Sequence, residues 1–244
     1  MKTAIVLATY FGDRRNYPRN QDEVVEVLDK QIEAARSLDM GCRCDLIIIN
    51  HDYGNAFALE YLNKINYQLT RNGRIIVHNR PVVQQDMSFG SYKYAYLVYR
   101  EQYDYYFFNE DDILPMKDNI VSDMIAAFEA DPKVGFVPAL LFTNCVHVHE
   151  MDDDGYIAKT GRGPAHAHGG VGLTSTEMLK EMSIQHPQYM GSIDDYRGAS
   201  NAIGGYNGQH AERDFTHIYC ESGYKLKCIS DGFRFKRLQD GRDL

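Results

Sequence analysis

Several features that would assign this sequence to a specialised class of protein are missing from it. No apolar run approaches the ~20 residues that a membrane-spanning helix needs, so we expect no membrane span. The apolar run near the start is too short for a signal peptide, and Asp13, Arg14 and Arg15 follow it at once. Internal repeats and low-complexity segments are also absent.

The chain also lacks a surplus of basic charge and a cysteine framework. Its formal net charge of -8 argues against a nucleic-acid-binding surface, which would be basic. The five cysteines are an odd number, and the closest pair, Cys42 and Cys44, forms only a CxC spacing. We therefore expect reduced thiols in a cytoplasmic protein.

What is present fits an ordinary globular protein. The 244 residues suffice for one large domain or two small ones. Apolar runs predict strands at Thr3–Ala8, Asp45–Asn50, Arg74–His78 and from Tyr105, and helical periodicity separates them. Four such alternations predict βαβ units, and hence an α/β fold with a mainly parallel sheet and helices on both faces.

The second half is less regular. We expect a helix over residues 120–128, a strand over Val134–Leu141, and long loops from Thr143 to Gly172, where binding residues tend to lie. Thr174 and Glu177 form a capping-box pattern for another helix. A last helix containing Phe215, Ile218 and Tyr219 should end at Gly223, followed by a short strand from Lys225 and a peripheral charged tail over residues 233–244.

The stretch from Tyr105 to Pro115 is the most informative. A buried aromatic strand runs into Glu110, Asp111 and Asp112. Three adjacent carboxylates repel one another and are costly to desolvate, whereas a divalent cation that takes their oxygens removes this cost. Ligands of open α/β sheets bind beyond the carboxyl ends of strands, which favours a metal site over the alternative of a solvated acidic turn.

Two histidine pairs support a rival interpretation. His147 with His149 and His166 with His168 have the HxH spacing that can ligate zinc, and Asp152–Asp154 lie near the first pair. These residues predict a metal-dependent hydrolase as the alternative. That alternative explains neither the strand order nor the position of the acidic triplet.

Three motifs in order resemble GT-A glycosyltransferases. FFNEDDILP is similar to the EDD form of the family's DxD motif in inverting enzymes of the N-acetylglucosaminyltransferase I type, and LIIINHDYGN resembles their second strand and loop. AERDFTHIYCESGYKL resembles the acceptor-side helix of family-2-like enzymes, although the first acid of its usual pair is replaced by Ala211. Tryptophan, often near the acceptor in this fold, is absent.

The resemblance covers roughly Ala4 to Ile229 and implies one GT-A domain, with a nucleotide-sugar half over residues 1–115 and an acceptor half over residues 116–244. It implies a nucleotide-sugar donor and a Mn²⁺ or Mg²⁺ ion that stabilises the leaving diphosphate. Asp112 would ligate the metal, Asp111 would bind the ribose, and Glu110 would act through water or the ribose.

The family binds the base and ribose at the end of the first strand, here Thr9 and Tyr10. Tyr10 can stack on a base or belong to the core. Arg14 can meet the diphosphate, although adjacent arginines also occur on plain surfaces. Asp52 can accept the imide N–H of uracil, and with the resemblance it favours a UDP-sugar; a simple Asx turn is the alternative.

Two further donor-binding residues are expected at a helix start. Ser91 and Lys93 are predicted to open the helix before the acidic strand, where backbone N–H groups bind phosphate. Lys93 can equally be a solvated charge. The loop Gly163–Leu173 is expected to border the sugar, because its glycines allow close backbone approach.

The resemblance places the catalytic base of an inverting transfer at Glu212, just before the last helix. It would take the proton of a hydroxyl on a glycan or other acceptor. Asp214, Asp194 and Asp195 are rival bases, and Glu212 can also simply stabilise the helix dipole. A non-catalytic nucleotide-sugar-binding module is the remaining alternative.

Overall fold

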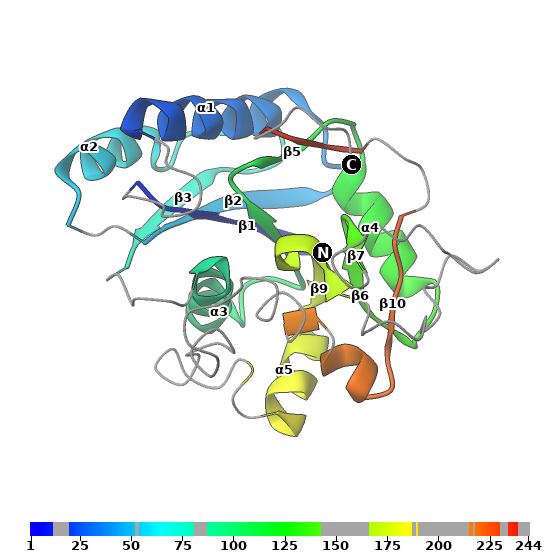
Figure 1. The fold of residues 1–244 in the computed structure, drawn as a ribbon. Helices are drawn as coiled ribbons and strands as arrows, with labels where there is room; N and C mark the ends of the chain where they lie inside the picture. Colours follow the sequence, from blue (N-terminus) through cyan, green and yellow to red (C-terminus); the bar gives the residue numbers. More distant parts are fainter. Residues whose placement is uncertain are drawn as a thin grey trace.

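A computed structural model describes residues 1–11, 20–51, 54–80, 87–142, 166–186, 189, 215–216, 218–229 and 234–238 of the chain. It is an α/β fold with a seven-stranded mixed sheet (Figure 1). The labelled helices are α1 (Gln21–Ser37), α2 (Ala56–Ile65), α3 (Met87–Tyr99), α4 (Ile120–Glu129), α5 (Thr176–Gln185) and the short η1 (His168–Gly170). The main sheet contains β1 (Lys2–Thr9), β2 (Arg43–Asn50), β3 (Ile75–Asn79), β4 (Tyr105–Glu110), β6 (Val134–Pro138), β9 (Gly172–Ser175) and β10 (Lys225–Leu226).

The strand order in this sheet is β10-β6-β9-β4-β1-β2-β3. β1 to β4 are all parallel where they pair, and β10 is parallel to β6. β9 runs antiparallel to both of its neighbours, β4 and β6. The predicted α/β class and mainly parallel sheet are therefore confirmed, and the sheet takes strands from both halves of the sequence.

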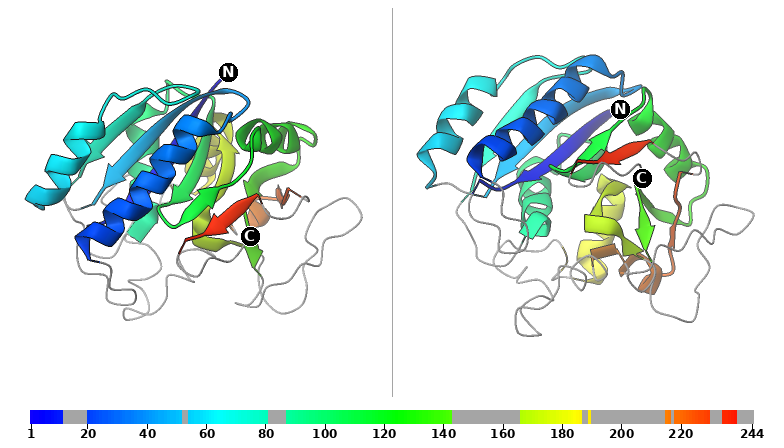
Figure 2. Two further views of the ribbon diagram at one scale, coloured as in Figure 1. Left: turned by 90° about the horizontal axis from the view of Figure 1, so that it is seen from above. Right: turned by 45° about the horizontal axis from the view of Figure 1, so that its top comes forward.

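The side chains of β1 point alternately to the two faces of the sheet, and apolar residues on both sides explain why both faces are covered by helices. Ile5 and Leu7 pack in a core with apolar residues of α1, α2 and α4. Ala4 and Val6 point to the opposite face and pack with residues of α3 and α5. Successive strand residues point to opposite faces, so one continuous apolar run fills both cores. Figure 2 shows the sheet between these two sets of helices.

The irregular second half contains a strand that the sequence pattern did not predict. Residues 172–175, expected as the end of a loop and a helix cap, form β9 in the sheet. Thr174 pairs with Tyr106, and its hydroxyl donates to the carbonyl oxygen of Gly135 at 2.8 Å. The predicted cap at Thr174 is wrong by one residue, because the side chain of Ser175 accepts the N–H of Met178 at 3.0 Å.

The charged tail is not wholly peripheral, which corrects a second expectation. β11 (Phe235–Arg237) pairs antiparallel with β5 (Ile113–Pro115), the short strand after the acidic triplet. β7 (Leu141–Phe142) and β8 (His166–Ala167) form another two-stranded sheet. The last predicted helix is confirmed in its described residues, and it ends before Gly223 as predicted. Gly223 itself has a left-handed φ of 87°.

We expect Phe235→Ala to destabilise the fold by about 3–5 kcal/mol, the usual cost of truncating a buried phenylalanine. Phe235 is 2% exposed, and its ring centroid lies 5.9 Å from that of Phe107 in β4. Urea unfolding measures the change. Lys236→Ala on the same strand is the matched control and should cost less than about 0.5 kcal/mol. Equal losses for the two variants would show that Phe235 is not a core residue.

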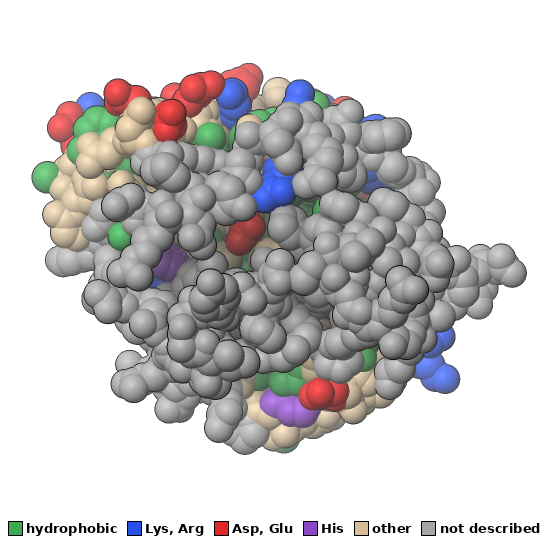
Figure 3. Space-filling view, viewed as in Figure 1, with side chains coloured by type: hydrophobic (Ala, Val, Ile, Leu, Met, Phe, Trp, Pro, Cys, Tyr) green, Lys and Arg blue, Asp and Glu red, His purple; other side chains and the backbone are tan. Residues whose placement is uncertain are grey.

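The outer surface of α1 and α2 is charged. Acidic side chains gather over these two helices in the space-filling view (Figure 3). Some pair with lysines one turn away, as in Glu26 with Lys30 and Glu60 with Lys64. Among the helices of the described residues, none combines the length and the apolar composition that crossing a membrane would require.

Candidate functional site

The carboxyl ends of β1 and β4 bring Thr9 beside the acidic triplet. These strands are parallel neighbours, and Ala8 pairs with Glu110 at their last shared position. One residue further on, the Thr9 hydroxyl donates to Asp111 Oδ2 at 3.2 Å. The contact therefore fixes the spacing of the two strand ends. Both side chains are buried, at 2% exposure each, so Asp111 faces the protein interior rather than solvent.

A glutamine from α1 holds the backbone of the acidic turn. Gln31 Nε2 donates to the carbonyl oxygens of Asp111 and Ile113, at 2.9 and 2.8 Å. Asn109 Nδ2 donates to the same Ile113 oxygen at 2.9 Å. Both amide side chains are buried, so these bonds are sheltered from water. The turn between β4 and β5 is thereby set in one conformation.

Glu110 is partly exposed and is held from two sides. Ser88, in the first turn of α3, donates its hydroxyl to Glu110 Oε1 at 2.9 Å. Gly169 in η1 has φ 58°, and a Cβ added there would lie 2.5 Å from Glu110 Oε2. Only glycine allows the backbone so close to the carboxylate. At Gly169 the backbone of this glycine-containing loop lies close to the Glu110 carboxylate, while the predicted contact of the loop with a sugar stays a prediction.

Asp112 is the second partly exposed carboxylate of the triplet. Its side chain is 13% exposed, and Arg237 Nε of β11 lies 4.0 Å from its Oδ2. The backbone N–H of Leu238 donates to the Asp112 carbonyl oxygen at 2.7 Å. The strand pairing of β5 and β11 therefore positions the residue, independently of its carboxylate.

The carboxylates suit a hard divalent cation, but only as part of its coordination shell. Among the described residues, no group of three or more His, Cys, Asp or Glu side chains is arranged to hold a metal ion. Mg²⁺ typically uses one or two carboxylates together with substrate phosphates and water. Asp112, with Glu110 nearby in sequence, fits an ion that is completed by the phosphates of a ligand.

A second polar cluster lies where β2 and β3 end. His51, directly after β2, hydrogen-bonds the Ser91 hydroxyl through Nε2, and Arg80 Nη2 lies 3.2 Å from His51 Nδ1. Arg80 follows β3, and its N–H donates to the Asn50 carbonyl oxygen at 2.9 Å. Sequence reasoning missed His51 and Arg80. The rule that found the triplet, polar residues just beyond strand ends, would have found them too.

The predicted phosphate-binding role of Ser91 and Lys93 at a helix start needs correction. α3 begins at Met87, so both residues lie within the helix, and they are 0% and 1% exposed. The free N–H groups belong to the first turn of a helix only. The aromatic pattern that suggested the start reflects the buried face of α3 instead. Ser88 is the residue of the first turn that meets the triplet.

Tyr10 follows β1 directly and is half-buried, so its side chain is not fully enclosed in the core. Its ring centroid lies 6.5 Å from that of His51, in an edge-on arrangement. Thr9, Tyr10 and the triplet thus share one edge of the sheet with the cluster around His51. This edge gathers most of the described residues for which the sequence predicted binding roles.

Several predicted residues lie outside the described part of the chain. These are Arg14 and its neighbour Arg15, Asp52, the base candidates Glu212, Asp214, Asp194 and Asp195, and the pair His147 and His149. For His166 and His168 only the backbone is described. Their predicted roles stay predictions.

Phe215, three positions after Glu212, is described and anchors this part of the chain. Its ring is 1% exposed, and its centroid lies 5.0 Å from that of Phe89 and 5.6 Å from that of Phe108. Phe89 follows Ser88, and Phe108 lies two residues before Glu110. The segment that begins at Phe215 therefore packs directly beneath the Glu110 side of the site.

Comparison of the sequence with protein-family models gave no match, and neither did comparison with curated protein sequences.

Proposed function

We propose that the chain is a metal-dependent glycosyltransferase of the GT-A fold, which moves a sugar from a UDP-sugar to a hydroxyl acceptor with inversion. One observation carries the proposal: Glu110 and Asp112 are partly exposed at the carboxyl end of β4, next to the end of β1. Open α/β sheets bind nucleotides at this edge. The three motifs that resemble the family occur in the order the family requires.

The residues of this edge divide the work of binding. Asp112 would ligate Mn²⁺ or Mg²⁺, and the bound ion would neutralise the charge that develops on the leaving diphosphate. Glu110 is oriented by the Ser88 hydroxyl and lies close to the backbone of Gly169. Its carboxylate would accept a hydrogen bond from a hydroxyl of the donor or from a bound water. Asp111 is buried against Thr9, so we assign it the positioning of the turn in place of the ribose contact.

The nucleoside would lie along the strand ends beyond β1 and β2. Tyr10 is the aromatic face available to a base, and Asp52 is the proposed acceptor for the uracil imide N–H. Arg14 is the proposed partner of the diphosphate. Glu212 would take the proton of the acceptor hydroxyl as its oxygen attacks the anomeric carbon. Four cysteines in the described residues are free, in keeping with the cytoplasmic location that we also propose.

A thermal-shift panel of UDP-, GDP-, CMP- and dTDP-sugars tests the donor class. A ligand at a hundredfold its Kd stabilises by about 2.7 kcal/mol, or about 5–10 °C for a domain of this size. We expect the largest shift from a UDP-sugar with Mn²⁺, and its loss when a chelator is added. A larger shift with a GDP-sugar would reject the uridine assignment, and an undiminished shift in chelator would reject the metal.

A further inference from the structure

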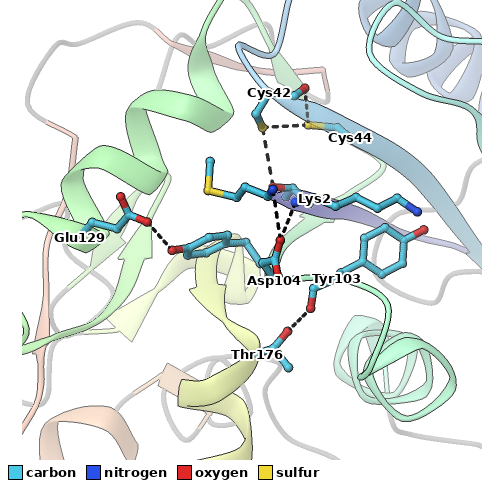
Figure 4. A network of polar contacts seen from close by, with 10 residues as sticks. Lys2, Cys42, Cys44, Tyr103, Asp104, Glu129 and Thr176 are labelled. Carbon is cyan, nitrogen blue, oxygen red and sulfur yellow. Dashed lines mark hydrogen bonds and ion pairs between the residues drawn. The ribbon is translucent and has the colours of Figure 1, made fainter.

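Cys42 and Cys44 lie at the amino ends of β1 and β2, the edge of the sheet opposite the acidic triplet. Cys42 immediately precedes β2, and Cys44 is the second residue of that strand. Thr3 of β1 pairs with Cys44. Figure 4 shows the two thiols side by side near the start of the chain. No residue proposed for sugar transfer lies here, so this cluster is independent of the proposed function.

The two sulfur atoms are in direct contact. Their Sγ atoms are 3.3 Å apart, and the Cys44 thiol lies 3.3 Å from the Cys42 carbonyl oxygen. The Thr3 hydroxyl lies 3.7 Å from Cys42 Sγ. Cys42 is partly exposed, whereas Cys44 is only 2% exposed. The Cys42 thiol is therefore accessible to reagents in solution, while the Cys44 thiol is buried in contact with it.

The surroundings favour a thiolate at Cys42. The hydrogen bond with Cys44 lowers the pKa of Cys42 to about 7, against the opposing effect of burial. Thr3 and the positive N-terminus also lower this pKa, and the Asp39 carboxylate raises it. The hydrogen bond with Cys42, burial and neighbouring negative charge raise the pKa of Cys44. The thiolate is the reactive form of a cysteine, so the exposed sulfur is also the nucleophilic one.

We propose that Cys42 and Cys44 form a peroxide-sensitive dithiol, in which Cys42 is oxidised first and Cys44 then closes a disulfide with it. The Cys42 thiolate attacks one oxygen of hydrogen peroxide, the O–O bond breaks, and the departing hydroxide takes up a proton to become water. Cys42 becomes a sulfenic acid by losing two electrons to the peroxide. The Cys44 sulfur then attacks the Cys42 sulfur, the S–O bond breaks, and the hydroxide leaves with the Cys44 proton as water.

The backbone permits the small movement that the disulfide needs. The sulfurs must approach from 3.3 Å to the ~2.05 Å of a disulfide bond. The ladder between β1 and β2 begins at Arg43, paired with Lys2, so Cys42 lies just outside it. Gly41, with φ 74°, precedes Cys42 in the bend before the strand. Cys42 can therefore shift without breaking a ladder hydrogen bond.

The sequence provides a direct assay, because trypsin cleaves after Arg43, between the two cysteines. We expect peroxide treatment of the native protein, followed by trypsin without reductant, to yield the Cys42 and Cys44 peptides joined and two hydrogen masses lighter. Reductant should separate them. Cys228 is the internal control, because burial raises its pKa to about 11 and it should oxidise far more slowly. Native protein whose Cys42 and Cys44 peptides stay unlinked, or whose Cys228 oxidises as fast as Cys42, overturns the proposal.

Replacing the second thiol tests the order of the two steps. In Cys44→Ser, Cys42 should still react with peroxide but should accumulate as a sulfenic acid that dimedone traps. Cys42→Ser should leave Cys44 unmodified under the same treatment, because that thiol is buried. Equal dimedone labelling of Cys42 in the native protein and in Cys44→Ser would show that Cys44 plays no part. Circular dichroism checks that each variant is folded. If a variant does not fold, the peptide assay on the native protein still decides whether Cys42 and Cys44 form a disulfide.

Discussion

Replacing Asp112 by Asn should remove most of the metal-dependent UDP binding and lower sugar transfer by at least about a hundredfold. A metal that stabilises transition-state charge is worth several kcal/mol, and each 1.36 kcal/mol corresponds to about tenfold in rate. Asn preserves the shape of the side chain but is a far weaker ligand for a hard cation. UDP titrations with Mn²⁺ and with a chelator, combined with a transfer assay, measure the change.

The Asp112→Asn variant should remain folded, because the residue is held through its backbone. Its carbonyl oxygen accepts the N–H of Leu238, and this bond does not involve the carboxylate. Glu101→Gln is the matched control, since it also removes one negative charge but lies exposed at the opposite end of β4. The control should behave as the native protein does. An Asp112→Asn variant with native transfer in the presence of a chelator would refute the metal assignment.

Glu212→Gln should separate donor binding from transfer. General-base catalysis contributes about 10²–10⁴-fold, so we expect transfer to fall by at least about a hundredfold while UDP and Mn²⁺ still bind. The glutamine side chain keeps the size and polarity of the acid and loses only its ability to take the acceptor proton. Rates at saturating donor and metal measure the loss.

Asp214→Asn is the matched comparison for the base, because Asp214 lies two positions further along the chain. We expect it to retain most of the transfer activity if Glu212 is the base. A near-native rate for Glu212→Gln would remove Glu212 from the mechanism. A collapse confined to Asp214→Asn would reassign the base to Asp214. Neither outcome would affect the donor-binding assignment of Asp112.

The sequence was sufficient for the parts of the fold that depend on local patterns. The continuous apolar runs of β1 and β2 and the aromatic run of β4 mark buried parallel strands. Because the acidic triplet comes at the end of the β4 run in the sequence, its place at the carboxyl end of that strand could be predicted as well. Each of these is encoded within a few residues by hydrophobicity and side-chain period. The hydrogen bond between Thr9 and Asp111 was not predicted, because it joins residues 102 positions apart in the chain.

The contacts that sequence reasoning missed are between distant segments. β11 pairs with β5 across more than a hundred residues, and β9 inserts between β4 and β6 with only four residues of its own. Short strands carry too little periodicity to be recognised, and their partners are set by tertiary packing. The Gln31 side chain that holds the acidic turn comes from the middle of α1, where a polar residue among apolar ones gives no sign of its target.

The most direct test follows a UDP-sugar panel with Mn²⁺ by proton NMR, using water as the acceptor. We expect at least one UDP-sugar to be consumed only when the metal is present. The released sugar should first appear with the anomeric configuration opposite to that of the donor, before it mutarotates. Release with retained configuration, or consumption that continues unchanged in a chelator, would contradict the proposed inverting, metal-dependent transfer.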